Sequence, residues 1–245
     1  MSITAAELIL YGVASIPIDD ASTTGGAIDL TVRPVFTQFG SSAKLSLTSD
    51  GTDTRLVDVV GRLASGAIAT ETVTLTNAVE VLSVNTYERI ESVKAQTTSA
   101  SRTVTLKQGA GGSTIATIPV NEKGVYMFFQ RSASSGSITD RYEKAFWKNT
   151  DATLSLLGAQ VTLTADPAAK IKIGLATAVD DSGTVANRTT APGGVSFVDD
   201  GVAQNVPGTD LAAGSAIGTW VNEHLAANDA AQKSTFTTQL SGSST

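Results

Sequence analysis

The stretch RLVDVVGRLASGAIATETVTLT, from Arg55 to Thr76, decides the fold class. Apolar and polar residues alternate in two runs on either side of Ala64-Ser65-Gly66, and a period of two is that of a strand with one buried face. A short Gly-containing turn between two such runs predicts a β-hairpin. We therefore expect a fold built from antiparallel strands.

Similar alternation continues through most of the chain, separated by Gly, Asn and Ser clusters that are typical of turns. Gly109-Ala-Gly-Gly112 lacks the GK[ST] ending of a phosphate-binding loop, so we expect it to be a hairpin turn. Further strands are expected at residues 79–84, 89–95, 103–106, 114–118 and 124–129, three more between 146 and 176, and a closing hairpin formed by residues 216–225 and 234–240.

Length and composition agree with this pattern. The chain has 245 residues, of which only 16% are charged, and Thr, Ser, Ala, Gly and Val fill the difference. Because one hydrophobic core usually serves about 100 to 150 residues, two domains are expected. The predicted fold class is all-β, with two sandwich-like or barrel-like domains in tandem and an extended amino-terminal arm.

The expected boundaries follow from composition. Residues 1–40 are irregular and contain Pro17 and Pro34, so they are interpreted as an arm or edge strand. Domain 1 is expected at 41–131 and domain 2 at 140–245, the polar stretch QRSASSGSITD lying between them. Domain 2 contains a loop at 179–211 that is longer than most loops of compact domains. The arm could add a strand to a neighbouring sheet edge through Ile28, Leu30, Val32 and Val35.

Charge and cysteine usage exclude several classes of partner and chemistry. A net charge of −6 without a basic run argues against a nucleic-acid partner. The absence of Cys removes disulfides and thiolate chemistry. No apolar stretch approaches the roughly 20 residues that span a bilayer, and the start MSITAAELILYG gives no export signal. We expect no membrane partner and no cofactor.

The titratable residues suggest only weak sites. His224 is the single histidine and is interpreted as a strand residue beside Trp220. The doublets Asp19-Asp20, Asp180-Asp181 and Asp199-Asp200 fit turns, where Asp bonds the backbone two residues on. Clustered carboxylates also suit Ca²⁺, which leaves a metal site as the alternative. Its candidate ligands are Asp180, Asp181, Asp199 and Asp200.

The aromatic residues allow two interpretations. Tyr142, Phe146, Trp147 and Trp220 could form a platform on which a sugar stacks, but in a chain with 5% aromatics they are expected in the core. The Asp doublets could in principle supply the paired acids of a glycosidase. Because they lie in Gly-rich stretches that fix no spacing, we predict that the protein is not an enzyme.

Two stretches resemble virion structural proteins of tailed bacteriophages: AELILYGVASIPIDDASTTGGAIDLTVRPVF (Ala6 to Phe36) and FWKNTDATLSLLGAQVTLTADPAAKIKIGLA (Phe146 to Ala176). The segment from Gly61 to Ala95 is similar to β-sandwich modules of phage capsid-associated proteins. Within that group the resemblance points to capsid decoration (cement) proteins. It implies a protein that binds the outside of the major capsid protein lattice and stabilises it, often as a homotrimer or another homo-oligomer. Such a protein is assembled in the host bacterial cytoplasm and ends on the virion surface.

Two other functions fit the same composition. A head-fibre, neck or tail component needs the same β architecture, and only its position in the particle distinguishes it. A carbohydrate-binding adhesive module is favoured by the Asp-rich loops and the aromatics, and disfavoured by the missing export signal.

Overall fold

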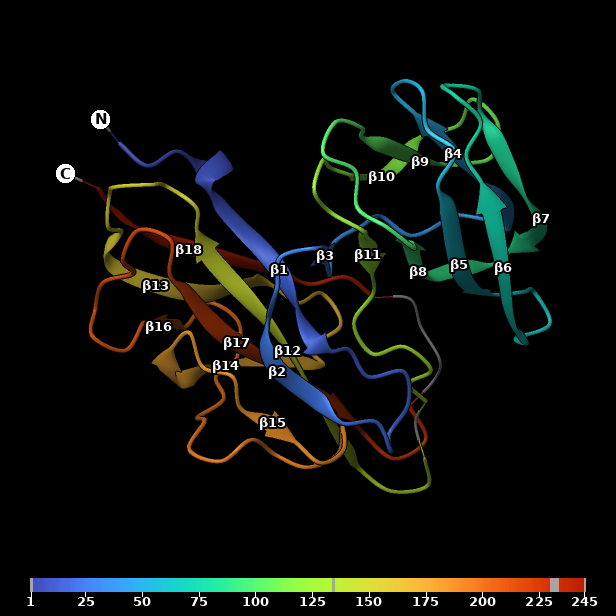
Figure 1. Cartoon of the computed structure of the whole chain (residues 1–245). Coiled ribbons are helices and arrows are strands. Elements are labelled where there is room, and N and C mark those ends of the chain that lie inside the picture. Colours follow the sequence, from blue (N-terminus) through green and yellow to red (C-terminus); the bar gives the residue numbers. More distant parts are fainter. Residues whose placement is uncertain (1, 134, 230–233, 245) are drawn as a thin grey trace. The chain divides into compact units, whose positions relative to one another are not determined.

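The computed structural model describes residues 2–133, 135–229 and 234–244 and confirms the all-β fold (Figure 1). Its regular elements are strands β1 to β18 and one short 3-10 helix, η1 (Ala5–Glu7), which carries a capping box between Thr4 and Glu7. No helix in the described ranges is long and apolar enough to cross a membrane.

The chain forms two compact units. Unit 1 combines Met1–Asp29 with Phe129–Thr245, and unit 2 is the continuous segment Leu30–Phe128. Unit 2 is thus inserted into the sequence of unit 1. Its two ends lie together because its first and last strands are parallel neighbours, and the Thr31 carbonyl accepts hydrogen bonds from the amides of Lys123 and Gly124.

Unit 2 is a sandwich of two sheets. The five-stranded sheet has the order β3 (Val32–Arg33), β11 (Gly124–Tyr126), β8 (Arg89–Ala95), β5 (Leu56–Arg62) and β6 (Ile68–Thr74). The four-stranded sheet has the order β10 (Thr114–Ile118), β9 (Val104–Gln108), β4 (Ala43–Ser49) and β7 (Val81–Tyr87).

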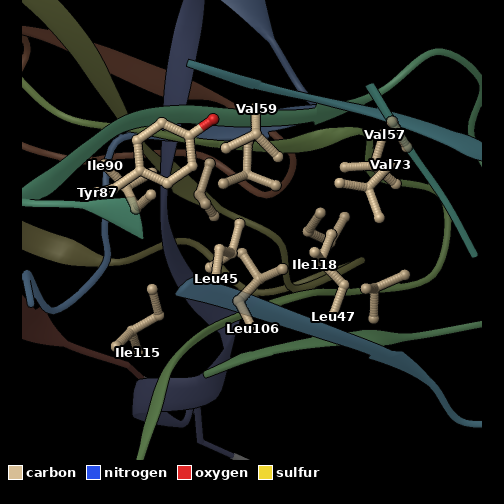
Figure 2. Close-up of a cluster of buried hydrophobic side chains, with 14 of the residues drawn as sticks. Leu45, Leu47, Val57, Val59, Val73, Tyr87, Ile90, Leu106, Ile115 and Ile118 are labelled. Carbon is tan, nitrogen blue, oxygen red and sulfur yellow. The ribbon is translucent and has the colours of Figure 1, made fainter. Parts of the chain in front are cut away.

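The core of unit 2 lies between these sheets, as Figure 2 shows. Leu45 and Leu106 from the four-stranded sheet meet Val59 and Ile90 from the five-stranded one, all completely buried. Burying each such side chain contributes about 1.5–3 kcal/mol. The alternation read from the sequence places these residues on the inner faces.

The hairpin expected at Arg55 to Thr76 is confirmed. Strands β5 and β6 pair from Leu56 with Thr74 to Arg62 with Ile68, and the turn between them contains Gly66 at a φ of 81°. The turn Gly109-Ala-Gly-Gly112 is also confirmed, because it joins β9 to β10. Of the other strands expected here, the one at 79–84 runs later, to Tyr87, and the one at 124–129 ends at Tyr126.

Unit 1 is also built from two sheets. The six-stranded sheet has the order β14 (Ile171–Val179), β17 (Ala216–Leu225), β12 (Thr139–Asn149), β1 (Leu8–Ser15), β2 (Thr24–Asp29) and β15 (Thr184–Val185). The three-stranded sheet has the order β16 (Ala203–Asn205), β13 (Leu157–Ala165) and β18 (Thr237–Ser243). One face of the larger sheet packs on the smaller through residues that include Ile173, Ile217, Val161 and Leu163.

The structure places the amino terminus differently from the arm expected at residues 1–40. Strand β1 is an interior strand that pairs with β12 on one side and β2 on the other, and its Val13 is buried. Residues 1–29 belong to unit 1, and unit 2 begins at Leu30 instead of residue 41. Because the partners of β1 in β12 lie 135 to 141 residues away, alternation along one segment could not indicate the pairing.

Two expectations for the carboxy-terminal part are corrected. Strands β17 and β18 do not form a hairpin, since β17 lies in the six-stranded sheet and β18 in the three-stranded one. The loop expected at 179–211 contains the short strands β15 and β16 and is tied to the sheets by the bridges Ile173 to Val198 and Leu156 to Leu211. Apart from these short pairings the segment is irregular, as expected.

Candidate functional site

The four candidate metal ligands do not converge on one point. Asp180 accepts a hydrogen bond from the amide of Ala216 at 2.8 Å, and Asp181 pairs with Lys144. Asp199 pairs with Lys172 at 3.1 Å, and Asp200 is exposed in the following turn. The described residues contain no group of three or more His, Cys, Asp or Glu side chains that could hold a metal ion. These carboxylates therefore act in turns and ion pairs.

The four residues expected to contact a neighbour are divided by the structure. Ile28 lies in β2, pairs with Val13 and packs against a small apolar cluster of unit 1. Val32 lies in β3 and is fully buried in unit 2. Leu30 and Val35 are about half exposed, at 47% and 54%. Only these last two present an apolar surface, and their contact with a partner stays a prediction.

Of the four aromatic residues expected in the core, Phe146 and Trp220 are buried, whereas Tyr142 and Trp147 are partly exposed. Phe146 is fully buried and Trp220 is 2% exposed, so neither offers a face on which a sugar could stack. Tyr142 packs against Phe197 with ring centroids 5.3 Å apart. His224 lies in β17, with Nδ1 at 2.9 Å from Asp140 Oδ1.

Lys144 is the buried cation on one face of the six-stranded sheet. Its ammonium lies 2.6 Å from Asp181 Oδ2 and 4.6 Å from the centre of the Phe146 ring, and it also donates to backbone carbonyls, including that of Gly26. Burial lowers the pKa of Lys144, and the Asp181 carboxylate acts against this shift. The contact ties the loop after β14 to β12 and β2.

A small pocket of about 190 Å³ lies beside this ion pair. Trp220, Asp181 and Pro192 are among its lining residues. Sites for small-molecule ligands usually enclose about 300–1,000 Å³. Trp220 is fixed against Gly25, where a side-chain Cβ would lie 2.7 Å from the carbonyl of Gly183 and 2.9 Å from the indole. The glycine therefore lets the loop approach the sheet closely.

The largest group of buried charges lies at one end of the six-stranded sheet. Arg188, which follows β15, is completely buried and reaches Asp20 through Nη2 at 2.7 Å and Glu143 through Nη1 at 3.3 Å. Arg141 of β12 reaches Asp20 through Nε at 2.6 Å and Glu223 through Nη1 at 3.5 Å. Two guanidinium groups thus hold three carboxylates that come from three segments distant in sequence.

The pKa values of the carboxyl groups in this cluster are shifted in opposite directions. The hydrogen bond from Arg141 lowers the pKa of Asp20 to about 2. Burial raises the pKa of Glu143 to about 8, outweighing the hydrogen bonds from Arg188 and from the amide of Phe129. Burial also raises the pKa of Glu223. The cluster therefore holds a proton in the neutral range, on Glu143.

Sequence reasoning missed Lys144 and all members of this cluster except Asp20, which it interpreted as a turn residue. Arg141 and Glu143 stand in the strand TDRYEKAFWKN, where charged residues are ordinarily read as facing solvent. Arg188 lies in the loop, without a motif. Only the pairing of distant segments brings these charges together and buries them.

Comparison with protein-family models, with curated proteins and with solved structures finds no match to this chain. A functional proposal must therefore rest on the residues themselves. In both buried clusters the charged groups are bonded to other parts of the protein. Chemically, both arrangements hold segments in place.

Proposed function

We propose that this protein is a structural component of a tailed-bacteriophage virion, namely a decoration protein that binds the outside of the major capsid lattice and stabilises it. The resemblance of the segments 6–36 and 146–176 to virion proteins supports the assignment. The two-unit β-sandwich fold is compatible with it. The observation that carries the proposal is the unequal distribution of apolar surface between the units.

Unit 2 carries most of the exposed apolar side chains. Among the described residues, eleven large hydrophobic side chains are exposed, and eight of them belong to unit 2. Five of these eight lie on or beside β5, β6 and β7, and Val84 of β7 is 82% exposed. An excess of large exposed apolar side chains in one unit supports contact with another protein there. The five are Leu56, Ile68, Val79, Leu82 and Val84.

Charge distribution supports the same division. Unit 2 has nine Lys and Arg against eight Asp and Glu, a net charge of +1. Unit 1 has eight against fifteen, a net charge of −7. Protein interfaces are depleted of charge at their centres, whereas a strong net charge favours solubility. We therefore assign shell binding to unit 2 and the solvated surface to unit 1.

The test uses particles of the phage whose genome encodes this chain. Mass spectrometry of purified particles should detect the chain in many copies, and electron cryomicroscopy should locate it on the outer capsid surface. A position at the neck, tail or head fibre would favour the alternative virion roles. Absence from purified particles would contradict every virion role and leave the carbohydrate-binding module, which glycan binding by the purified protein would then support.

A matched pair of substitutions tests the assignment to unit 2. Val84→Asp places a charge in the exposed apolar surface, and we expect it to reduce occupancy on shells that lack the protein by about tenfold or more. Val202→Asp is the control, because Val202 is 48% exposed and lies in unit 1. Equal occupancy of both variants would contradict the assignment. Sedimentation of the free protein measures whether it forms a homotrimer or another homo-oligomer.

A further inference from the structure

Four titratable side chains of unit 1, three of them buried and one partly buried, hold one short segment. The return segment, residues 129–133, is where the chain re-enters unit 1 after unit 2. Arg188 Nη1 donates to the Gln130 carbonyl at 2.6 Å, and Arg141 Nη2 donates to the Ala133 carbonyl at 2.8 Å. The amide of Phe129 donates to Glu143 Oε1 at 2.9 Å.

Glu223 is the fourth of these side chains, and its Oε2 accepts a hydrogen bond from the Ser132 hydroxyl. We call Arg141, Glu143, Arg188 and Glu223 the latch. Each member makes a hydrogen bond to the return segment and also lies within salt-bridge distance of another charge of the cluster. The segment is thus held by titratable side chains.

The return segment also holds an unfavourable backbone conformation. Phe129 and Arg131 have φ values of 54° and 56°, in the left-handed region that side-chain-bearing residues rarely adopt. Such residues persist only where the surroundings hold them. A segment that is strained and held by charges would relax if the charges were rearranged.

The charges of the cluster are not balanced when all groups are ionised. Arg141 and Arg188 supply two positive charges, while Glu143, Glu223 and Asp20 supply three negative ones. Asp20 is 46% exposed, so water stabilises part of its charge, but Glu143 is buried. An uncompensated buried charge is strongly unfavourable, and a buried acid avoids it by keeping its proton.

We infer that the return segment is held by a proton-dependent latch, which is closed in mildly acidic solution and loosens toward mildly alkaline solution. Opening exposes Glu143 to water and lets it release its proton. Because the closed state binds that proton and the open state does not, opening becomes more favourable as the pH rises. The groups that face Glu143 are Arg188 from the loop, Glu223 from β17 and Arg141 from its own strand, with Asp20 reached through the two arginines.

The pH range in which the latch stays closed follows from the opposite pKa shifts of Glu143 and Asp20. The raised pKa of Glu143, about 8, makes the latch looser as the pH rises from about 4.5, its ordinary value, to about 8. The lowered pKa of Asp20, about 2, acts in the opposite sense, because the stabilisation from its bonds to the arginines is lost as the pH falls from 3.8, its ordinary value, to about 2. Protection of the return segment should therefore be greatest near pH 5.

Hydrogen exchange of the intact protein tests this inference. We expect the protection factor of the Phe129 amide, corrected for the intrinsic effect of pH on exchange, to fall at least about tenfold from pH 5.5 to pH 8.5. In Glu143→Gln, which keeps an acceptor but cannot ionise, most of this pH dependence should vanish. Glu71→Gln is the matched control, because Glu71 in unit 2 also accepts backbone amides, from Val84 and Asn85.

Two outcomes would overturn the inference. One is a protection factor in the wild-type protein that stays constant from pH 5.5 to pH 8.5, a result that needs no variant to fold. The other is a fall of the same size in Glu143→Gln as in the wild type. A control variant that behaves as the wild type, with a flattened response in Glu143→Gln, would support the latch. These readouts are independent of whether the protein binds a capsid.

Discussion

Unit 1 and unit 2 bury charge in different ways. In unit 2 the buried charged groups are Asp53, Glu91 and Glu122, and the arginine paired with each stays partly exposed. In unit 1 both partners can be buried, as Arg188 and Glu143 are. Unit 2 is one continuous segment, whereas unit 1 is assembled from two. The comparison suggests that hydrogen-bonded pairs of fully buried titratable side chains are used where segments distant in sequence must be joined.

The energetic consequence is an asymmetry between making and breaking such pairs. Replacing a whole buried ion pair by apolar residues is often neutral, while removing one partner leaves a charge without compensation. Unit 1 should therefore be more sensitive than unit 2 to loss of a single charged side chain. The two tryptophans, Trp147 and Trp220, both lie in unit 1, so their fluorescence reports the unfolding of that unit.

The largest effect is expected for Arg188→Ala. It removes the bonds from a buried guanidinium to Asp20, Glu143 and the Gln130 carbonyl, and hydrogen bonds from a charged donor contribute about 1.5–3 kcal/mol each, so the loss should be about 3–5 kcal/mol of unfolding free energy. Urea unfolding followed by tryptophan fluorescence measures it. The control is Lys172→Ala, whose ion pair with Asp199 is exposed and should contribute at most about 1 kcal/mol. Both substitutions lie in unit 1, so equal effects would show that burying the charged pair adds nothing to its contribution.

A slightly smaller effect is expected for Leu106→Ala in unit 2. Leu106 is fully buried between the two sheets, and its truncation should cost about 2–5 kcal/mol through lost burial and a cavity (Figure 2). Circular dichroism should show an earlier transition, while the tryptophan transition of unit 1 stays in place. If both transitions move together, the two units unfold as one cooperative body, and their stabilities cannot be compared separately.

The same division between units explains how much the sequence could predict. The hairpin of β5 and β6 and the turn at Gly109 to Gly112 were predicted because alternation and turn residues act between neighbours in sequence. Strand β1 was interpreted as an arm because its partner β12 begins at Thr139. Local pattern contains no information on such distant pairing.

The candidate sites show the same limit. The turn interpretation of the Asp doublets and the core position of Phe146 and Trp220 needed only residue chemistry and composition. The latch could not be predicted, because Arg141 and Arg188 are ordinary surface residues by composition. They become buried only when the segment before unit 2 and the segment after it close on one sheet.

The smallest effect is expected where unit 2 buries a polar group at its edge. The Tyr87 hydroxyl donates to Glu71 Oε1 at 2.8 Å, and burial raises the pKa of this tyrosine, so it remains a donor at all ordinary pH values. Tyr87→Phe removes one hydrogen bond but leaves Glu71 its bonds from the amides of Val84 and Asn85. The expected loss is about 1 kcal/mol, measured by circular dichroism in urea.

Tyr142→Phe in unit 1 is the control for this substitution. The Tyr142 ring packs against Phe197, a contact that phenylalanine keeps, so the change should stay within about 0.5 kcal/mol. A loss of 3 kcal/mol or more for Tyr87→Phe would show that the Glu71 contact stabilises unit 2 as strongly as a buried ion pair. Unit 2 would then also depend on a charged side chain for its stability. The two units would differ only in where such side chains lie, and no longer in how strongly they stabilise the fold.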